Sequence, residues 1–335
     1  MTTNATPPTA ARDAAGARPR WPAIVAACVS MTILGLSVFV VSRTLAGLDW
    51  AALRAAIRAT SAEQFALAGL FAAGSYLALT GYDWIALRHL RERVRYPTIA
   101  LASFSASSLS MTLGFPLATG GAVRYWIYSR AGVRATRVAA IILIVSVTYW
   151  MGVAGVLGAG LLLRPAELAD VDRLPVSVNI GLGALIVAAL LVWIGWVSVK
   201  PRRFSLRGMV VEAPRARFAL AQIVVAMADV SCAAGALWAL TPDGHGLDFL
   251  GFAPTFVAAQ VLGVASNVPG GVGPFEAAML NAVDGLPAET LFASLLLFRI
   301  VYFLVPFVLG LAALGAHEAW TRWAALREAM AGDED

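Results

Sequence analysis

The sequence predicts an all-α membrane protein that crosses the bilayer several times, and both composition and segment length support this. Hydrophobic residues fill 59% of the 335 positions and charged residues only 13%, whereas a soluble domain carries about 25% charged residues. The mean hydropathy of the chain is +0.76. Eight apolar segments approach the length of about 20 residues that a helical span needs. They lie at 21–45, 63–87, 97–115, 136–163, 176–199, 216–241, 250–268 and 288–316.

Two of these segments end in glycine and proline, which break helices. The third segment runs into Gly-Phe-Pro and then the pair Gly120-Gly121, and the seventh runs into Asn-Val-Pro and then Gly270-Gly271. Backbone can leave the helix inside lipid only where protein or water satisfies its polar groups. We therefore expect six full spans and two re-entrant segments, each of which returns to the side it entered. The alternative is eight crossing helices, with the glycine-rich loops returning through the membrane.

The basic residues orient the chain in the membrane. All of them are arginine except Lys200. If neither broken segment crosses, 19 of them lie on one side and five on the other, with Arg299 inside a span. Because arginine and lysine concentrate on the cytoplasmic side, we expect both termini in the cytoplasm. The run 21–44 carries no charge except Arg43 and is too long for a signal-peptide core, so we expect a retained first span.

The order of the segments repeats, and this sets the domain organisation. Residues 21–163 and 176–316 each read span, span, broken segment, span, and the two Gly-Gly pairs are 150 residues apart. Each half has an odd number of crossings, so the second half is inverted relative to the first, as in alternating-access transporters. We expect a disordered tail at 1–20, a transmembrane domain at 21–318 and a short cytosolic tail at 319–335. The alternative is two unrelated loops with ordinary glycine–proline turns.

Three ionisable residues fall inside the expected spans and are candidates for substrate binding: Asp83, Asp229 and Arg299. Such residues are rare in spans and mark functional positions. Because a lone charge there costs several kcal/mol, we expect Asp229 and Arg299 to pair. The pair would either contact substrate or form a buried ion pair that fixes helix packing, and the residues alone leave both interpretations open.

Arg124 and Glu276 follow the two Gly-Gly pairs and are the other charged candidates. Exposed backbone N–H groups at such turns bind anions, so we expect the four glycines named above to line the same site. Arg124 offers a planar fork suited to phosphate, and Glu276 suits a cationic headgroup or a proton. The ordinary alternatives are a loop cap for either residue and a plain cytoplasmic charge for Arg124.

The two broken segments resemble a known family. Residues 267–276 read Asn-Val-Pro-Gly-Gly-Val-Gly-Pro-Phe-Glu, similar to the Pro-Gly-Gly-x-Gly-x-Phe-Glu signature of the lysylphosphatidylglycerol synthase transmembrane region family. This region is the flippase part of the multiple peptide resistance factor. Residues 114–133, with Arg124 and then Arg-Ala-Gly-Val, look like its first-half counterpart, and the resemblance covers about residues 20–318. It implies a bacterial inner-membrane protein that moves a lipid between leaflets, with Arg124 and Glu276 as site residues.

In two-domain members of that family the lipid is aminoacyl-phosphatidylglycerol, made by a soluble C-terminal domain. No such domain follows within the 335 residues, so we expect a stand-alone lipid flippase without synthase activity. The expected partners are a membrane phospholipid and a possible separate synthase, with no nucleic acid, cofactor or metal. The alternatives are an intramembrane lipid-modifying enzyme, disfavoured because GxSxG and HExxH are missing, and a membrane subunit that recruits a synthase or glycosyltransferase. The lipid, the energy source and the oligomeric state are not predicted.

Overall fold

A computed structural model describes most of the chain after residue 49. The described residues are 50–113, 118–199, 203–206, 209–212, 216–242, 248–265, 271–283 and 285–332. The expected tail at 1–20, the expected first span at 21–45 and the candidate Gly270 lie outside these residues.

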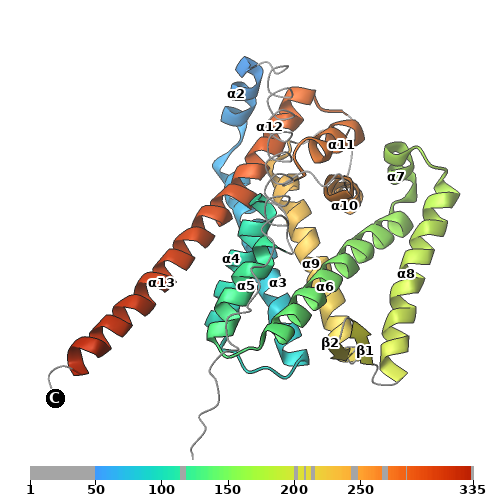
Figure 1. Cartoon of the computed structure of the whole chain (residues 1–335). Coiled ribbons are helices and arrows are strands. Elements are labelled where there is room, and N and C mark those ends of the chain that lie inside the picture. Colours follow the sequence, from blue (N-terminus) through green and yellow to red (C-terminus); the bar gives the residue numbers. More distant parts are fainter. Residues whose placement is uncertain are drawn as a thin grey trace, which may run out of the picture.

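Long apolar helices dominate the structure (Figure 1). Among the described residues, five helical segments are long and apolar enough to cross a membrane. They are α3 (Ala62–His89), α6 (Ala135–Leu163), α8 (Val176–Val199), α9 (Ala216–Leu240) and the continuous run α12 (Ala288–Phe298), η2 (Arg299–Leu304) and α13 (Val305–Gly332). Their positions match five of the six expected spans, which confirms a polytopic α-helical membrane protein.

Local sequence explains where these helices begin and end. The Ser61 hydroxyl accepts a hydrogen bond from the Gln64 backbone N–H, and the Gln64 side chain accepts one from the Ser61 N–H, so a capping box starts α3. Helix α6 ends at Leu163, two residues before Pro165, whose fixed φ begins the short helix α7 (Pro165–Asp172). Short elements join the other spans: α2 (Trp50–Ala59) precedes α3, and an antiparallel pair of strands, β1 (Arg203–Leu206) and β2 (Met209–Glu212), joins α8 to α9.

Each broken segment folds as a helical hairpin. Hairpin 1 consists of α4 (Tyr96–Leu113) and α5 (Thr119–Arg130), and hairpin 2 of α10 (Phe249–Ala265) and α11 (Pro274–Ala282). The two arms of each hairpin pack against one another. Figure 1 shows hairpin 1 in the lower half of the molecule and hairpin 2 near its upper end. The two hairpins therefore enter the bundle from opposite ends, as the inverted arrangement predicts.

The two halves interlock through these hairpins. Spans α3 and α9 pack together, whereas α4 packs on α13 and α10 packs on α6, so each hairpin meets the last span of the other half. Both contacts use a glycine: Gly160 lies against the Pro254 ring and Gly310 against Ser108, close enough that a Cβ would collide. These glycines are 150 residues apart, the same offset that separates the Gly-Gly pairs. The structure thus repeats the pattern seen in the sequence.

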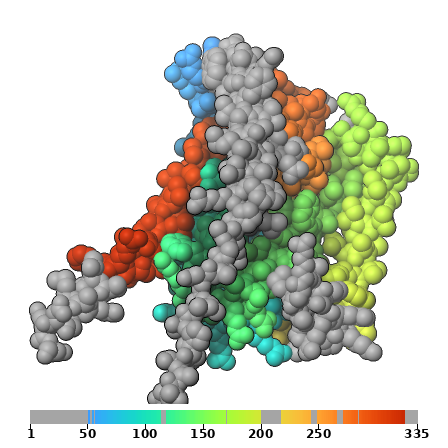
Figure 2. All heavy atoms as spheres, in the orientation of Figure 1, coloured from blue at the N-terminus to red at the C-terminus, as the bar shows by residue number. Residues whose placement is uncertain are grey.

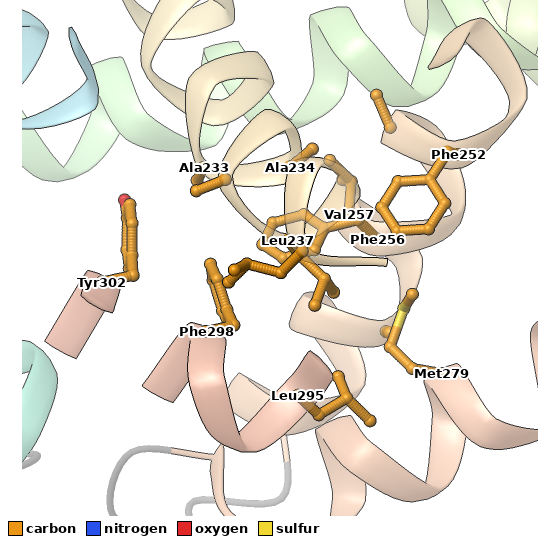
Figure 3. Packing of buried hydrophobic residues seen from close by; sticks show 14 of the residues in the cluster. Ala233, Ala234, Leu237, Phe252, Phe256, Val257, Met279, Leu295, Phe298 and Tyr302 are labelled. Carbon is orange, nitrogen blue, oxygen red and sulfur yellow. The ribbon is translucent and has the colours of Figure 1, made fainter. Parts of the chain in front are cut away.

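The largest buried cluster lies where α9, hairpin 2 and the last span meet. Leu237, Phe252, Phe256, Leu295 and Phe298 are each at most 1% exposed, and their side chains converge from α9, α10 and α12 (Figure 3). Helix α9 is mostly buried, whereas α8 is mostly exposed. In the space-filling view α8 forms one margin of the molecule and the red part of α13 projects at the other (Figure 2). Exposed apolar side chains on these helices fit a lipid-facing surface.

Candidate functional site

Hairpin 1 carries a buried ion pair. Helix α5 places Arg124 against Asp83 of α3, with Nε 3.0 Å from Oδ2 and Nη2 3.0 Å from Oδ1. The two residues are 5% and 0% exposed. This two-point geometry is the strongest form of arginine–carboxylate pairing. The structure therefore brings together two candidates that the sequence treats separately.

Hydroxyl groups complete this first pair. Tyr128, one turn after Arg124 on α5, donates its hydroxyl to Asp83 Oδ2 over 2.6 Å. Arg124 Nη2 also donates to the Ser107 hydroxyl of α4 over 3.4 Å. Neither Tyr128 nor Ser107 was among the predicted site residues. The spacing of four residues between Arg124 and Tyr128, which places them on one helix face, is the signal that could have found the tyrosine.

Hairpin 2 carries a second ion pair with the charges exchanged. Glu276, in the first turn of α11, accepts from Arg299 Nε over 2.8 Å, and Nη2 lies 2.6 Å from the same oxygen, Oε1. The other carboxylate oxygen accepts the Gly273 backbone N–H over 2.7 Å. The guanidinium also lies over the rings of Phe303 and Phe275, at 4.8 and 5.6 Å from their centroids. The side chains of Arg299 and Glu276 remain 17% and 9% exposed.

The expected pairing of Asp229 with Arg299 is wrong. Asp229 Oδ1 accepts the hydroxyl of Ser75, and Oδ2 accepts that of Tyr82 over 2.7 Å, while Arg299 binds Glu276. Asp229 lies on the face of α9 that packs against α3, whereas Arg299 opens the η2 turn beside hairpin 2. The sequence indicates how far along its span each charged residue lies. It does not indicate how each helix is rotated about its axis, and this rotation decides which partner the residue meets.

The Ser75 hydroxyl extends this third group to the last span. It lies 2.6 Å from the Tyr302 hydroxyl, and Tyr302 stacks on Phe298 (Figure 3). The Tyr302 carbonyl accepts from the Tyr76 hydroxyl over 3.2 Å. Pro306, four residues later, has no N–H to offer that carbonyl. The proline thus leaves an acceptor that α3 satisfies, and the region is wound as the π-helix η2.

The glycines beside the charges allow close packing. A Cβ at Gly120 would lie 3.1 Å from the Ala106 carbonyl oxygen, and one at Gly121 would lie 3.3 Å from Ile142. Gly271 has φ +63°, a conformation that favours glycine, and packs on the backbone of Gly263. These three glycines therefore have structural roles, and their contact with substrate stays a prediction.

Comparison with known proteins identifies the relatives of this chain. The family model described as lysylphosphatidylglycerol synthase TM region matches residues 24–310. The uncharacterized protein slr0712 of Synechocystis is 30% identical over 304 residues, which is 89% of this chain and 91% of that protein. The inner membrane protein YbhN of Escherichia coli is 26% identical over 242 residues, 71% of this chain and 74% of that protein. The phosphatidylglycerol lysyltransferase of Staphylococcus aureus is 35% identical over 71 residues, 21% of this chain but 8% of that protein.

Proposed function

The chain belongs to the lysylphosphatidylglycerol synthase TM region family, and from this premise we propose that it moves a phospholipid with a charged headgroup between the leaflets of the bacterial inner membrane. One observation carries the proposal: two hairpins enter the bundle from opposite ends, and the second arm of each binds a full span through an ion pair. A charged site on an inverted pair of broken helices is the arrangement of alternating-access transporters.

The ion pairs suit a headgroup because they can exchange partners. A lone charge near the bilayer centre costs about 2.5–3.5 kcal/mol on insertion scales, so the empty protein keeps its charges paired. A phosphate can replace Glu276 beside Arg299, and an amine on the headgroup can replace Arg299 beside Glu276. When both exchanges occur together, Arg299 and Glu276 each keep a partner of opposite charge. Aminoacyl-phosphatidylglycerol carries both groups and is the first lipid to test.

The pair of hairpin 2 is the better entry point for the headgroup. Its guanidinium contacts one carboxylate oxygen and is partly exposed, whereas the pair of hairpin 1 is buried and bonded at two points. The rings of Phe275 and Phe303 flank the guanidinium and would also contact a cationic headgroup through their faces. We place both termini on the cytoplasmic side, where most of the arginines lie. Hairpin 2 then opens toward the periplasm.

The test is lipid translocation by the full chain in proteoliposomes. Each variant is scored by the leaflet exposure of aminoacyl-phosphatidylglycerol. Glu276→Gln and Arg299→Gln should reduce the rate at least tenfold, because each leaves one headgroup charge without its partner. Glu63→Gln, an exposed acid in the first turn of α3, is the matched control and should behave as wild type. Wild-type translocation rates in both site variants would overturn the proposal. Mass spectrometry of the same lipid would reveal covalent change, the mark of an enzyme.

A further inference from the structure

The three intramembrane acids have different partners. Asp83 binds Arg124 and Glu276 binds Arg299, whereas Asp229 binds the hydroxyls of Ser75 and Tyr82. Among the described residues, no cation lies within ion-pair distance of Asp229. The residue is 2% exposed, and a carboxylate so placed without a cation is costly. A bound proton removes that cost.

The hydroxyl partners of Asp229 can form hydrogen bonds with its carboxyl group in both the charged and the protonated state. When the carboxylate is charged, Tyr302 donates to Ser75, which donates to Asp229 Oδ1, and Tyr82 donates to Oδ2. When Asp229 carries a proton, it can donate to Ser75, and Ser75 can donate to Tyr302, because each hydroxyl is both donor and acceptor. The chain of bonds reverses and each of its oxygen atoms keeps a hydrogen-bond partner, while the Tyr302 hydroxyl changes from donor to acceptor. Arginine has donors only, so protonation of Asp83 or Glu276 would disrupt its pair.

Among the described residues, the other ionisable groups that face Asp229 are tyrosines and a cysteine, side chains whose ordinary pKa values lie above about 8. Tyr76 and Tyr82 face it from α3, Tyr149 from α6, Tyr302 from η2 and Cys232 from α9 itself. The described residues of α8 and α10 include no ionisable side chain, and α12 contributes Glu289 in its first turn. A proton that enters this region therefore resides on Asp229.

One short segment links Asp229 to the lipid site. Helix η2 begins at Arg299, the partner of Glu276, and contains Tyr302, the partner of Ser75. π-helical turns are rare, and they occur frequently at functional sites. A headgroup that draws Arg299 away from Glu276 would move η2, and Tyr302 would then leave Ser75.

We propose that Asp229 is a proton-binding site and that η2 couples its proton to movement of the lipid headgroup. The proposal rests on the proposed function for its coupling step, but the proton site itself does not. The proton comes from water on one side, binds a carboxylate oxygen of Asp229, and leaves to water on the other side. No redox or covalent step is involved.

The coupling is tested by imposing a pH difference of one unit across proteoliposomes that contain the full chain. If one proton moves with each lipid, the wild type should shift the leaflet ratio of labelled aminoacyl-phosphatidylglycerol by up to about tenfold, because one pH unit is a factor of ten in proton activity. Asp229→Asn should still equilibrate the lipid, but to the same ratio with and without the gradient. A gradient response in the variant equal to that of wild type, or no response in the wild type, would overturn the coupling. No translocation by the wild type at any pH would overturn the proposed function instead.

A second measurement reports on the proton without any transport. Infrared difference spectra of the purified protein between pH 5 and pH 9 should contain the stretching band of a protonated carboxyl group, and Asp229→Asn should lose it. Tyr302→Phe keeps the acid and the ring but removes one hydroxyl from the chain of bonds, so it should move the pH midpoint of the band. A band that is unchanged in Asp229→Asn would overturn the assignment of the proton to this residue. Thermal melting of each variant checks that it is folded.

Discussion

The two hairpins share a backbone plan but carry opposite charges. In hairpin 1 the arm bears the cation and the span bears the acid, with Arg124 held by Asp83; in hairpin 2 the arm bears the acid and the span the cation, with Glu276 held by Arg299. The first pair is buried, bonded at two points and supported by Tyr128, whereas the second is partly exposed and lies against aromatic rings. A repeated scaffold thus holds one ion pair that is buried and one that is partly exposed.

Breaking the first pair tests this difference most severely. Arg124→Met leaves the Asp83 carboxylate buried without a cation, so we expect a loss of about 3–5 kcal/mol in the free energy of unfolding. Adding Asp83→Leu should recover most of it, because apolar residues often replace a buried pair at little cost. The measurement is denaturant unfolding in detergent. Glu276→Gln should cost less than Arg124→Met, and the reverse order would contradict the comparison.

The glycine contacts give a second, smaller test. Gly160→Ala places a methyl group against the rigid Pro254 ring, and Gly310→Ala places one against the Ser108 hydroxyl. We expect overpacking costs of about 1–3 kcal/mol, larger at Gly160 because a proline ring cannot rotate away. Gly195→Ala on α8, with no atom within 4 Å of the added Cβ, is the control and should be neutral or slightly stabilising. Equal stability of the Gly160 and Gly195 variants would contradict the close contact.

The smallest effect is expected at the exposed end of hairpin 2. Arg164 Nη2 lies 2.5 Å from Asp248 Oδ2, and this hydrogen bond holds the pKa of Asp248 below its usual value. The lowered pKa means that the pair stabilises the folded protein above the ordinary pKa of an aspartate, about 3.9, and that this contribution disappears as the pH falls through the folded value. Asp248→Asn should therefore lower the melting temperature slightly at pH 7 and leave it unchanged near pH 2. Because the pair is exposed, 1 M salt should remove the difference.

Much of the architecture was readable from the sequence, for physical reasons. The expected spans 136–163 and 176–199 agree with α6 and α8 to within a residue, because the bilayer sets the length of an apolar helix whatever packs beside it. Glycine and proline located both hairpins for the same reason, since only they break a helix in lipid at low cost. No comparable sequence signal predicts the short β-hairpin between α8 and α9.

The partners of the charges were not readable. Which acid meets Arg299 depends on how α9 and the last span are rotated about their axes, and the apolar surroundings of both helices leave no amphipathic stripe to indicate it. In the sequence, nothing distinguishes Ser75 and Tyr302 from other polar residues in membrane spans. Their link to Asp229 is visible only when α3, α9 and η2 are packed together. No sequence pattern predicts the π-helical turn either. Pro306 indicates only that the Tyr302 carbonyl lacks the backbone N–H it would otherwise accept from.

The packing of α4 on α13 has a consequence for biosynthesis. Ser105 and Ser108 of α4 are 0% exposed, and Gly310 covers them. About 200 residues separate the two helices in the chain. At a synthesis rate of roughly 5–20 residues per second, α13 is therefore made many seconds after the serine face of α4 that it covers. Hairpin 1 reaches its final packing only when the last span has been inserted. The contact between α4 and α13 is therefore among the last to form during synthesis of the chain.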